Sequence, residues 1–139
     1  MTNPSSAESR QERFDRGMET LVAVVGEGGR SVIDALADIH PEFAHQIVAW
    51  GFGEIYSRPG LPPRDRQLVT LGMLTALGGC EPQLEVHLNA ALNVGLTPEE
   101  ITETLLHTVG YCGFPKALNA TLVAKKVFGE RGLLPVGNQ

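Results

Sequence analysis

The sequence predicts an all-α fold, a compact bundle of about six to seven helices. Three observations favour this class. The segment after Pro82 carries apolar residues at i, i+4, i+7 and i+8, the spacing of one helix face: Leu84, Leu88, Ala91 and Leu92. Proline and glycine stand between the apolar segments, where helices begin and end. No segment alternates apolar and polar residues over a useful length, as a half-buried strand would.

The first half of the chain predicts three helices after a polar beginning. Residues 1–12 (MTNPSSAESRQE) are rich in Ser, Glu and Arg, which is typical of a flexible arm or of a segment ordered only against a partner subunit. We expect a single domain over residues 13–139, close to the common domain size. A helix over 13–25 and a short one over 32–37 precede a third, which begins at Pro41 and carries Phe43, Ile47, Trp50, Ile55 and Tyr56.

Residues 58–63 (RPGLPP) form a hard break, because proline cannot continue a helix. The helix predicted over 63–77 is apolar on nearly all sides, so we expect it to be central and buried. The next helix runs from Pro82 to Val94 and is closed by Gly95.

The last two predicted helices have clear start signals. Residues 97–100 (TPEE) form a capping box with proline at the first helical position, and the helix that follows reaches about Gly110. Residues 113–115 (GFP) introduce a final helix that extends to about Phe128.

Charge and composition exclude several classes of protein. The formal charge is −5, from 11 basic and 16 acidic residues, and only Lys125 and Lys126 are adjacent cations, so we expect no nucleic-acid partner. The longest apolar stretch, residues 68–77, is too short to cross a bilayer. No signal peptide is recognisable, so we expect a cytoplasmic protein without a membrane partner, with Cys80 and Cys112 as free thiols.

His87 is the main candidate for chemistry, because it borders the apolar stripe of its helix and imidazole titrates near neutrality. Gln83 lies one turn earlier on the same side, and Cys80 precedes the helix, where the helix dipole favours a thiolate. A half-buried histidine bonded to a carbonyl and a cysteine that only packs are the plain alternatives. For Arg64 and Arg66 the plain alternative is a solvated side chain in the first turn of a helix. For Tyr111, Cys112 and Phe114 it is a position in the core. The four histidines show neither a His-Glu-x-x-His pattern nor an i, i+4 pair, so we predict no metal site.

Several segments occur in a fixed order along the chain: 52–61 (FGEIYSRPGL), 66–71 (RQLVTL), His87 with 90–95 (AALNVG), 97–101 (TPEEI) and 111–115 (YCGFP). Read together, they resemble the carboxymuconolactone decarboxylase family, and the similarity covers roughly residues 42–130. The resemblance implies a helical bundle related to the alkylhydroperoxidase D proteins. It also implies a homo-oligomer, a trimer or a hexamer.

The resemblance implies a decarboxylase that uses no metal or organic cofactor. Family members of this kind convert 4-carboxymuconolactone to an enol-lactone in the protocatechuate branch of aromatic breakdown, the β-ketoadipate pathway. The chain departs from that subgroup at Asn89, where arginine is usual, and at Gln83, where glutamate is usual. The wider family often has glutamate where Gln67 stands. Since asparagine cannot replace an arginine fork on a carboxylate, a related small organic acid is an alternative substrate.

The hypothesis assigns roles to the site residues. His87 transfers the proton, and Glu54 orients it or acts as a second acid–base group. Arg66 anchors an anionic group of the substrate. Gln83 and Tyr111 donate hydrogen bonds to the substrate. Trp50 and Phe114 form apolar walls, and Cys80 places a thiol close to the histidine.

Two other functions stay open. A thiol-dependent peroxidase would use Cys80, but it needs a resolving thiol nearby. The alkylhydroperoxidase D relatives place cysteines four and seven residues before the histidine, and here those positions are Gln83 and Cys80. Cys112 could serve only if the fold brings it close. The third possibility is a non-catalytic small-molecule binder that keeps the family's oligomeric core.

Overall fold

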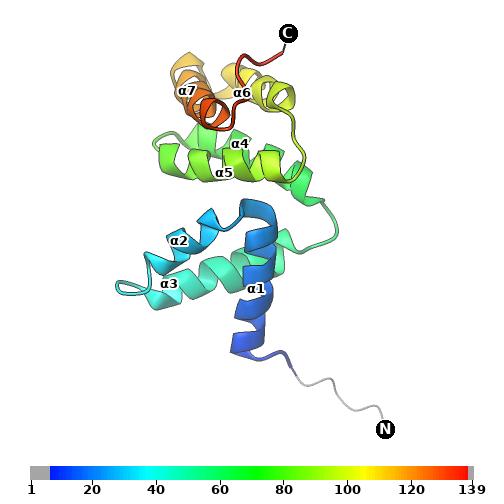
Figure 1. Cartoon of the computed structure of the whole chain (residues 1–139), viewed down its shortest axis with the longest axis vertical. Helices are drawn as coiled ribbons and strands as arrows, with labels where there is room; N and C mark the ends of the chain where they lie inside the picture. The colour runs from blue at the N-terminus through cyan, green and yellow to red at the C-terminus, as the bar shows by residue number, and fades with distance from the viewer. Residues whose placement is uncertain (1–6, 138–139) are drawn as a thin grey trace. The chain divides into compact units, whose positions relative to one another are not determined.

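The computed structural model of the chain describes residues 7–137. Every regular element in this part is a helix, so the predicted all-α class is confirmed. The chain divides into two compact units, Met1–Pro59 and Gly60–Gln139, called unit 1 and unit 2 below (Figure 1). The expectation of one domain over residues 13–139 stays a prediction.

Unit 1 begins earlier than the sequence suggested. Ser9 and Glu12 form a capping box, in which the Ser9 hydroxyl accepts from the Glu12 N–H at 3.1 Å and the Glu12 carboxylate accepts from the Ser9 N–H at 2.7 Å. Residues 10–12 of the expected arm are therefore helical, and residues 1–6 lie outside the described part. The helices of unit 1 are α1 (Arg10–Val25), α2 (Gly28–Asp34), α3 (Pro41–Gln46) and η1 (Ile47–Tyr56).

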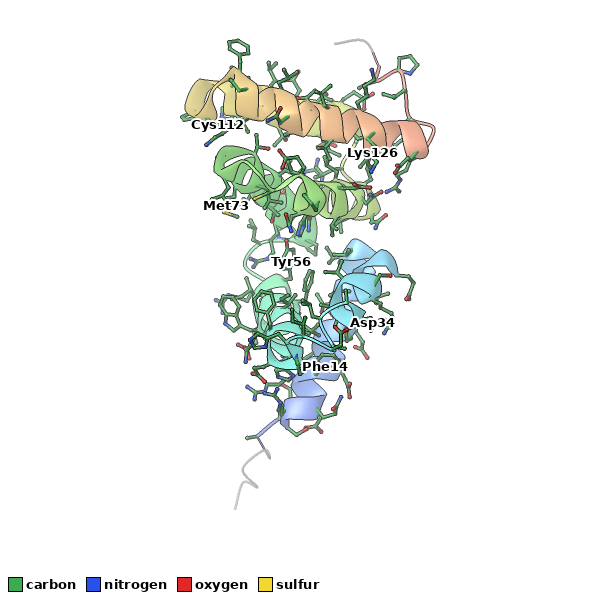
Figure 2. The ribbon with its side chains drawn as sticks, turned by 90° about the vertical axis from the view of Figure 1, so that its left-hand side faces the viewer. Phe14, Asp34, Tyr56, Met73, Cys112 and Lys126 are labelled. Atoms are coloured by element: carbon green, nitrogen blue, oxygen red, sulfur yellow. The ribbon has the colours of Figure 1, made fainter. Side chains whose placement is uncertain are left out.

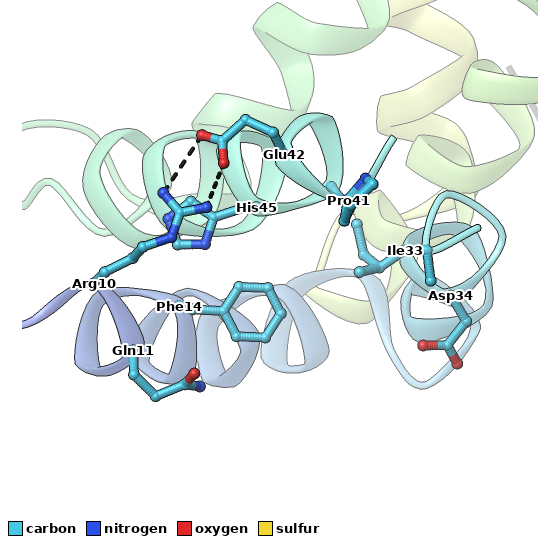
Figure 3. A pocket seen from close by; sticks show the side chains of 10 residues that line it. Arg10, Gln11, Phe14, Ile33, Asp34, Pro41, Glu42 and His45 are labelled. Carbon is cyan, nitrogen blue, oxygen red and sulfur yellow. Dashed lines mark hydrogen bonds and ion pairs between the residues drawn. The ribbon is translucent and has the colours of Figure 1, made fainter. Parts of the chain in front are cut away.

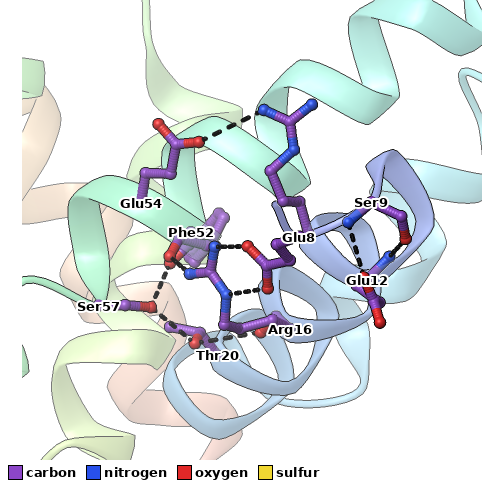
Figure 4. Close-up of polar contacts among 10 residues, drawn as sticks. Glu8, Ser9, Glu12, Arg16, Thr20, Phe52, Glu54 and Ser57 are labelled. Carbon is purple, nitrogen blue, oxygen red and sulfur yellow. Dashed lines mark hydrogen bonds and ion pairs between the residues drawn. The ribbon is translucent and has the colours of Figure 1, made fainter. Parts of the chain in front are cut away.

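The helix that begins at Pro41 is an α-helix only as far as Gln46, because the following element, η1, is a π-helix of 10 residues. Side chains satisfy carbonyl groups near its end: an Arg16 Nη donates to the Gly53 carbonyl, and the Ser57 hydroxyl donates to that of Phe52 at 2.8 Å (Figure 4). The Thr20 hydroxyl lies 3.0 Å from that of Ser57. The periodicity of the sequence does not reveal a π-helix, since its wider turn depends on such tertiary partners.

Two glycines let α1 and η1 approach backbone to backbone. A Cβ added at Gly17 would collide with the main-chain carbonyl of Val48, and one added at Gly53 would lie 3.3 Å from the Gly17 Cα. Gly17 and Gly53 are both buried. The α1–η1 contact, the most extensive between helices of unit 1, therefore depends on the missing side chains.

Unit 2 is a ring of four helices, α4 (Pro63–Leu77), α5 (Glu81–Asn93), α6 (Pro98–Cys112) and α7 (Phe114–Glu130) (Figure 1). α4 packs against α5 and α6, and α7 packs against the same two helices from the other side. The core between them is made of buried apolar side chains: Leu71, Leu84, Leu88, Ala91, Leu96, Ile101, Leu105, Ala120, Ala124, Val127 and Phe128.

The predicted ends of these helices are confirmed within a few residues. Gly95 follows α5 with φ +99° and Gly113 follows α6 with φ +85°, conformations that favour glycine. Thr97 caps α6 in the predicted capping box, where its hydroxyl accepts from the Glu100 N–H at 3.1 Å. α6 continues two residues beyond Gly110, because the turn follows only at Gly113.

This cap gives a first prediction. Replacing Thr97 by Ala should lower the free energy of unfolding by about 1 kcal/mol, because it leaves the Glu100 N–H without its acceptor. Thermal unfolding followed by circular dichroism measures the change. Thr97→Ser keeps the hydroxyl and is the matched control. A Thr97→Ala protein as stable as the wild type would contradict the assignment.

The expectation that the helix over 63–77 is buried all round is wrong. Gln67, Leu71 and Thr75 are buried in α4, but three apolar residues of the same helix are 51%, 55% and 70% exposed: Val69, Met73 and Leu77. Figure 2 shows Met73 at the edge of unit 2. A helix in a four-membered ring has an inner and an outer side, and its apolar outer side cannot be recognised from the sequence. Within the described residues, no helix is long and apolar enough to span a membrane.

Candidate active site

The centre of the candidate site is a contact between α5 and α4. The Nδ1 of His87 lies 3.1 Å from the Oε1 of Gln67. Gln67 is fully buried and His87 is half-buried. The two residues are 20 positions apart and meet because α4 and α5 pack side by side.

This contact defines the state of the imidazole. An amide oxygen can only accept a hydrogen bond, so Nδ1 of His87 carries the proton and donates it to Gln67. Burial lowers the pKa of His87 below its usual 6.5, because the charged ring would lose its hydration. Burial therefore favours the neutral form of His87.

The second ring nitrogen is available. Nε2 of His87 has no hydrogen-bond partner among residues 7–137. In the same part of the chain, no fully buried side-chain nitrogen or oxygen lacks a partner. It follows that Nε2 is at least partly exposed to solvent.

Two arginines begin α4, and both are fixed rather than freely solvated. The Nε of Arg66, the residue next to Gln67, donates to the Leu61 carbonyl at 3.0 Å, and the side chain is half-buried. Arg64 forms an ion pair with Glu100 of α6. Arg66 precedes Gln67 by one position in α4, and neighbouring helix positions face different directions, so its role as an anchor for an anion stays a prediction.

The remaining candidates of unit 2 are more open. Tyr111 is 84% exposed and Phe114 is 76% exposed, so the alternative that placed them in the core is wrong for the chain as described. The Tyr111 ring packs against that of His107, with centroids 5.4 Å apart. Gln83 is also exposed. Their role as substrate contacts stays a prediction.

Trp50 and Glu54 belong to η1 in unit 1. The carboxylate of Glu54 lies 4.0 Å from the guanidinium of Arg13, and Trp50 is 58% exposed. The structure thus gives Glu54 a partner in α1. The acid–base role of Glu54 and the wall formed by Trp50 stay predictions.

The two cysteines are free thiols, as predicted. Cys80 stands at the N-cap of α5, where its thiol donates to the Gly78 carbonyl at 3.5 Å. Cys112 ends α6, and its thiol donates to the Thr108 carbonyl at 3.2 Å. Each thiol is thus bonded to a carbonyl of its own turn. No observation favours the peroxidase alternative.

Sequence reasoning missed two polar residues near the site. It treated Gln67 only as a departure from the family, although a glutamine inside an otherwise apolar helix is a signal for a buried polar partner. Arg131 follows α7, and its guanidinium lies 3.3 Å from the Asn89 Oδ1 and 3.4 Å from that of Asn93. A guanidinium therefore stands beside Asn89, where the resemblance expects an arginine. No local pattern relates residues 42 positions apart.

Unit 1 has a hollow of its own, about 500 Å³ and open to solvent (Figure 3). Arg10 and Glu42 form an ion pair at its rim, and Phe14 stacks on His45 with ring centroids 5.7 Å apart. The bond from Arg10 lowers the pKa of Glu42 to about 2, so this pair stays ionised at neutral pH. Its charges neutralise each other, so the pair attracts an anion only weakly. Residues 7–137 hold no group of three or more His, Cys, Asp and Glu side chains arranged for a metal ion.

Comparisons with known proteins show the family of the chain. Residues 41–126 match the model of the carboxymuconolactone decarboxylase family, and the chain belongs to this family. It is 39% identical over 127 residues to a 4-carboxymuconolactone decarboxylase from Acinetobacter baylyi, covering 90% of this chain and 93% of the relative. It is 31% identical over 134 residues to a nitrosuccinic acid decarboxylase from Metarhizium robertsii, covering 93% of this chain and 90% of the relative.

Proposed function

We propose that the protein is a cofactor-independent carbon–carbon lyase that removes CO2 from a small dicarboxylic acid. The observation that carries the proposal is the accessible Nε2 of a neutral, half-buried His87, whose other ring nitrogen is held by Gln67. Membership in a family with two relatives named as decarboxylases supports it. We expect the activity in the cytoplasm, without metal or organic cofactor.

The names of the two relatives suggest the substrate class. 4-Carboxymuconolactone and nitrosuccinic acid are both succinates substituted at the carbon that bears one carboxyl group. In the first this carbon is attached to a double bond that is conjugated to a lactone carbonyl, and in the second it carries a nitro group. Each substituent can accept the electron pair that CO2 leaves behind. We therefore propose a succinate with an electron-accepting group at C2, of which 4-carboxymuconolactone is the leading case.

The reaction must be balanced by one proton. The bond between C2 and the departing carboxylate breaks, and its electron pair passes to C2 and into the electron-accepting group. Nε2 of the neutral His87 takes up a proton from solvent and so forms the imidazolium. This Nε2–H bond then breaks, its electron pair stays on Nε2, and the proton forms the new C–H bond, which returns the ring to its neutral form. Arg66 binds the carboxylate that is retained, since a guanidinium matches a carboxylate in shape and charge.

The test is CO2 release from a small panel of acids. 4-Carboxymuconolactone and nitrosuccinate each contain the proposed substrate pattern, while 2-methylsuccinate has the same skeleton without an electron acceptor. We expect turnover with at least one of the first two and none with the third. In D2O the product should carry one deuterium, at the former C2 for nitrosuccinate and at the carbon next to the lactone carbonyl for 4-carboxymuconolactone, because protonation of the dienolate at that carbon gives the enol-lactone. A protein that binds these acids and releases no CO2 would be the non-catalytic family member instead.

A homo-oligomer is the partner we propose, because the ring of unit 2 has apolar side chains on its outside. Exposed apolar residues recur on α7 at i, i+4 and i+8, and they are joined by others on α4 and α6: Phe114, Leu118, Leu122, Val69, Met73, Leu77 and Leu106. Monomers seldom expose apolar patches of more than a few hundred Å². A second copy of the chain would cover such a surface.

Light scattering after gel filtration tests this prediction. The wild type should have a mass three or six times 14.9 kDa, and Leu118→Glu with Leu122→Glu should shift it towards the monomer. Asn119→Glu adds a charge to an exposed polar position of the same helix and should leave the mass unchanged. A wild-type protein of 14.9 kDa would contradict the proposal.

A further inference from the structure

We propose that Gln67 is a positioning residue that keeps a proton on Nδ1 of His87, so that the proton gained and lost in catalysis resides on Nε2 alone. The inference deepens the proposed function and rests on it. It concerns this chain in particular, because the neutral amide stands where the family resemblance expects a carboxylate.

The contact with Gln67 allows Nδ1 of His87 to act only as a hydrogen-bond donor. The Gln67 Oε1 lies 3.1 Å from Nδ1 and has no proton to give, whichever protonation state the ring adopts. Gln67 is 0% exposed, so water cannot take its place. In the neutral ring and in the imidazolium alike, Nδ1–H therefore donates to Gln67, and only Nε2 titrates.

A neutral partner also adds no charge that would stabilise the imidazolium. A carboxylate at this position would attract the imidazolium and raise its pKa, whereas an amide adds no charge. Burial alone then lowers the pKa of His87, and the imidazolium becomes a stronger acid towards carbon.

Several charged groups on the helices around α5 have partners of their own. Those of α4, α6 and α7 pair with each other, with α5 or with main-chain carbonyls: Arg64 with Glu100, Lys126 with Glu85, Arg66 with the Leu61 carbonyl and Lys116 with the Ala76 carbonyl. None of them contributes to the lowered pKa of His87, for which burial is the cause.

The direct test is nitrogen NMR of the histidine rings in the full-length protein without substrate. Above the pKa, His87 should give a protonated Nδ1 and an unprotonated Nε2. The three other histidines serve as references in the same spectrum. The opposite tautomer, or an equal mixture, would overturn the inference. This readout does not depend on turnover, so a protein that releases no CO2 would refute the proposed function and leave the inference intact.

Two variants test the consequence for catalysis. Gln67→Glu keeps the acceptor and adds a charge, so the pKa of His87 should rise by about one to three units. The alkaline limb of kcat, set by loss of the imidazolium, should move to higher pH by the same amount. Gln67→Met has a similar length and no acceptor, and should lower kcat at least about tenfold with a smaller change in KM, because the tautomer is no longer fixed.

Circular dichroism and the NMR dispersion of each variant establish whether it folds. If Gln67→Met does not fold, the wild-type spectrum and Gln67→Glu still decide. A Gln67→Glu protein with an unchanged pKa of His87 would overturn the inference. So would a folded Gln67→Met protein that keeps the wild-type kcat and tautomer.

Discussion

Replacing His87 by Gln should reduce kcat for decarboxylation at least about a hundredfold, because a positioned acid contributes on the order of 10²–10⁴ to such a rate. The amide of the new residue can still bond to Gln67 across the α4–α5 contact, so the change removes the titrating nitrogen and little else. His87→Ala should have the same effect on kcat. Steady-state kinetics with the best substrate of the panel measures both.

The control for this prediction is another histidine. His40 is the N-cap of α3, where its Nδ1 accepts from the Phe43 N–H at 3.2 Å. His40→Asn keeps a good capping residue for α3 and should leave kcat within about twofold, since the proposal gives His40 no part in the reaction. The far-ultraviolet spectra of all variants should match the wild type. If His87→Gln and His87→Ala both retained full activity, His87 would have no part in the mechanism.

Replacing Gly17 by Ala should destabilise the protein by at least about 2 kcal/mol, in the upper part of the range for overpacked sites. The new Cβ would collide with the Val48 carbonyl, and a main-chain atom in a helix cannot turn aside as a flexible side chain can. α1 and η1 must move apart, and buried contacts between them are lost. The melting temperature should fall by roughly 6–10 °C.

Gly51 supplies the matched control for this second prediction. It lies in η1, like Gly53, but a Cβ added there meets nothing within 4 Å. Gly51→Ala should leave stability unchanged or raise it by up to about 1 kcal/mol, because alanine loses less backbone freedom on folding. Differential scanning calorimetry distinguishes the two variants. Equal melting temperatures for Gly17→Ala and Gly51→Ala would show that α1 and η1 do not approach as described.

Local signals were sufficient to predict most helix boundaries of unit 2. Pro63 begins α4, Thr97 caps α6, and Gly95 and Gly113 follow helices with positive φ. These signals act through residues one to four positions away, which is why a sequence reveals them. In unit 1 the same reasoning placed α2 four residues too late, since it interpreted Gly28 and Gly29 as a break.

The π-helix and the outer side of α4 could not be predicted. The Gly53 and Phe52 carbonyls of η1 depend on Arg16 and Ser57, and the Arg16 contact joins residues 37 positions apart. α4 shows apolar residues on every side, and only its place in the ring decides that Leu71 is buried while Val69 is exposed. Whether such a residue is buried or exposed depends on which helices pack against it in the folded chain.

The sequence by itself determined the helical class and the caps and singled out His87 as the candidate for chemistry, because these inferences depend on neighbours along the chain and on residue type. The tertiary structure alone decided which nitrogen of His87 is held and which is accessible. That choice requires Gln67, 20 positions earlier, to face α5 from inside α4. It also requires enough burial to lower the pKa of the imidazole. Both conditions arise from the packing of two helices, and no local pattern encodes them.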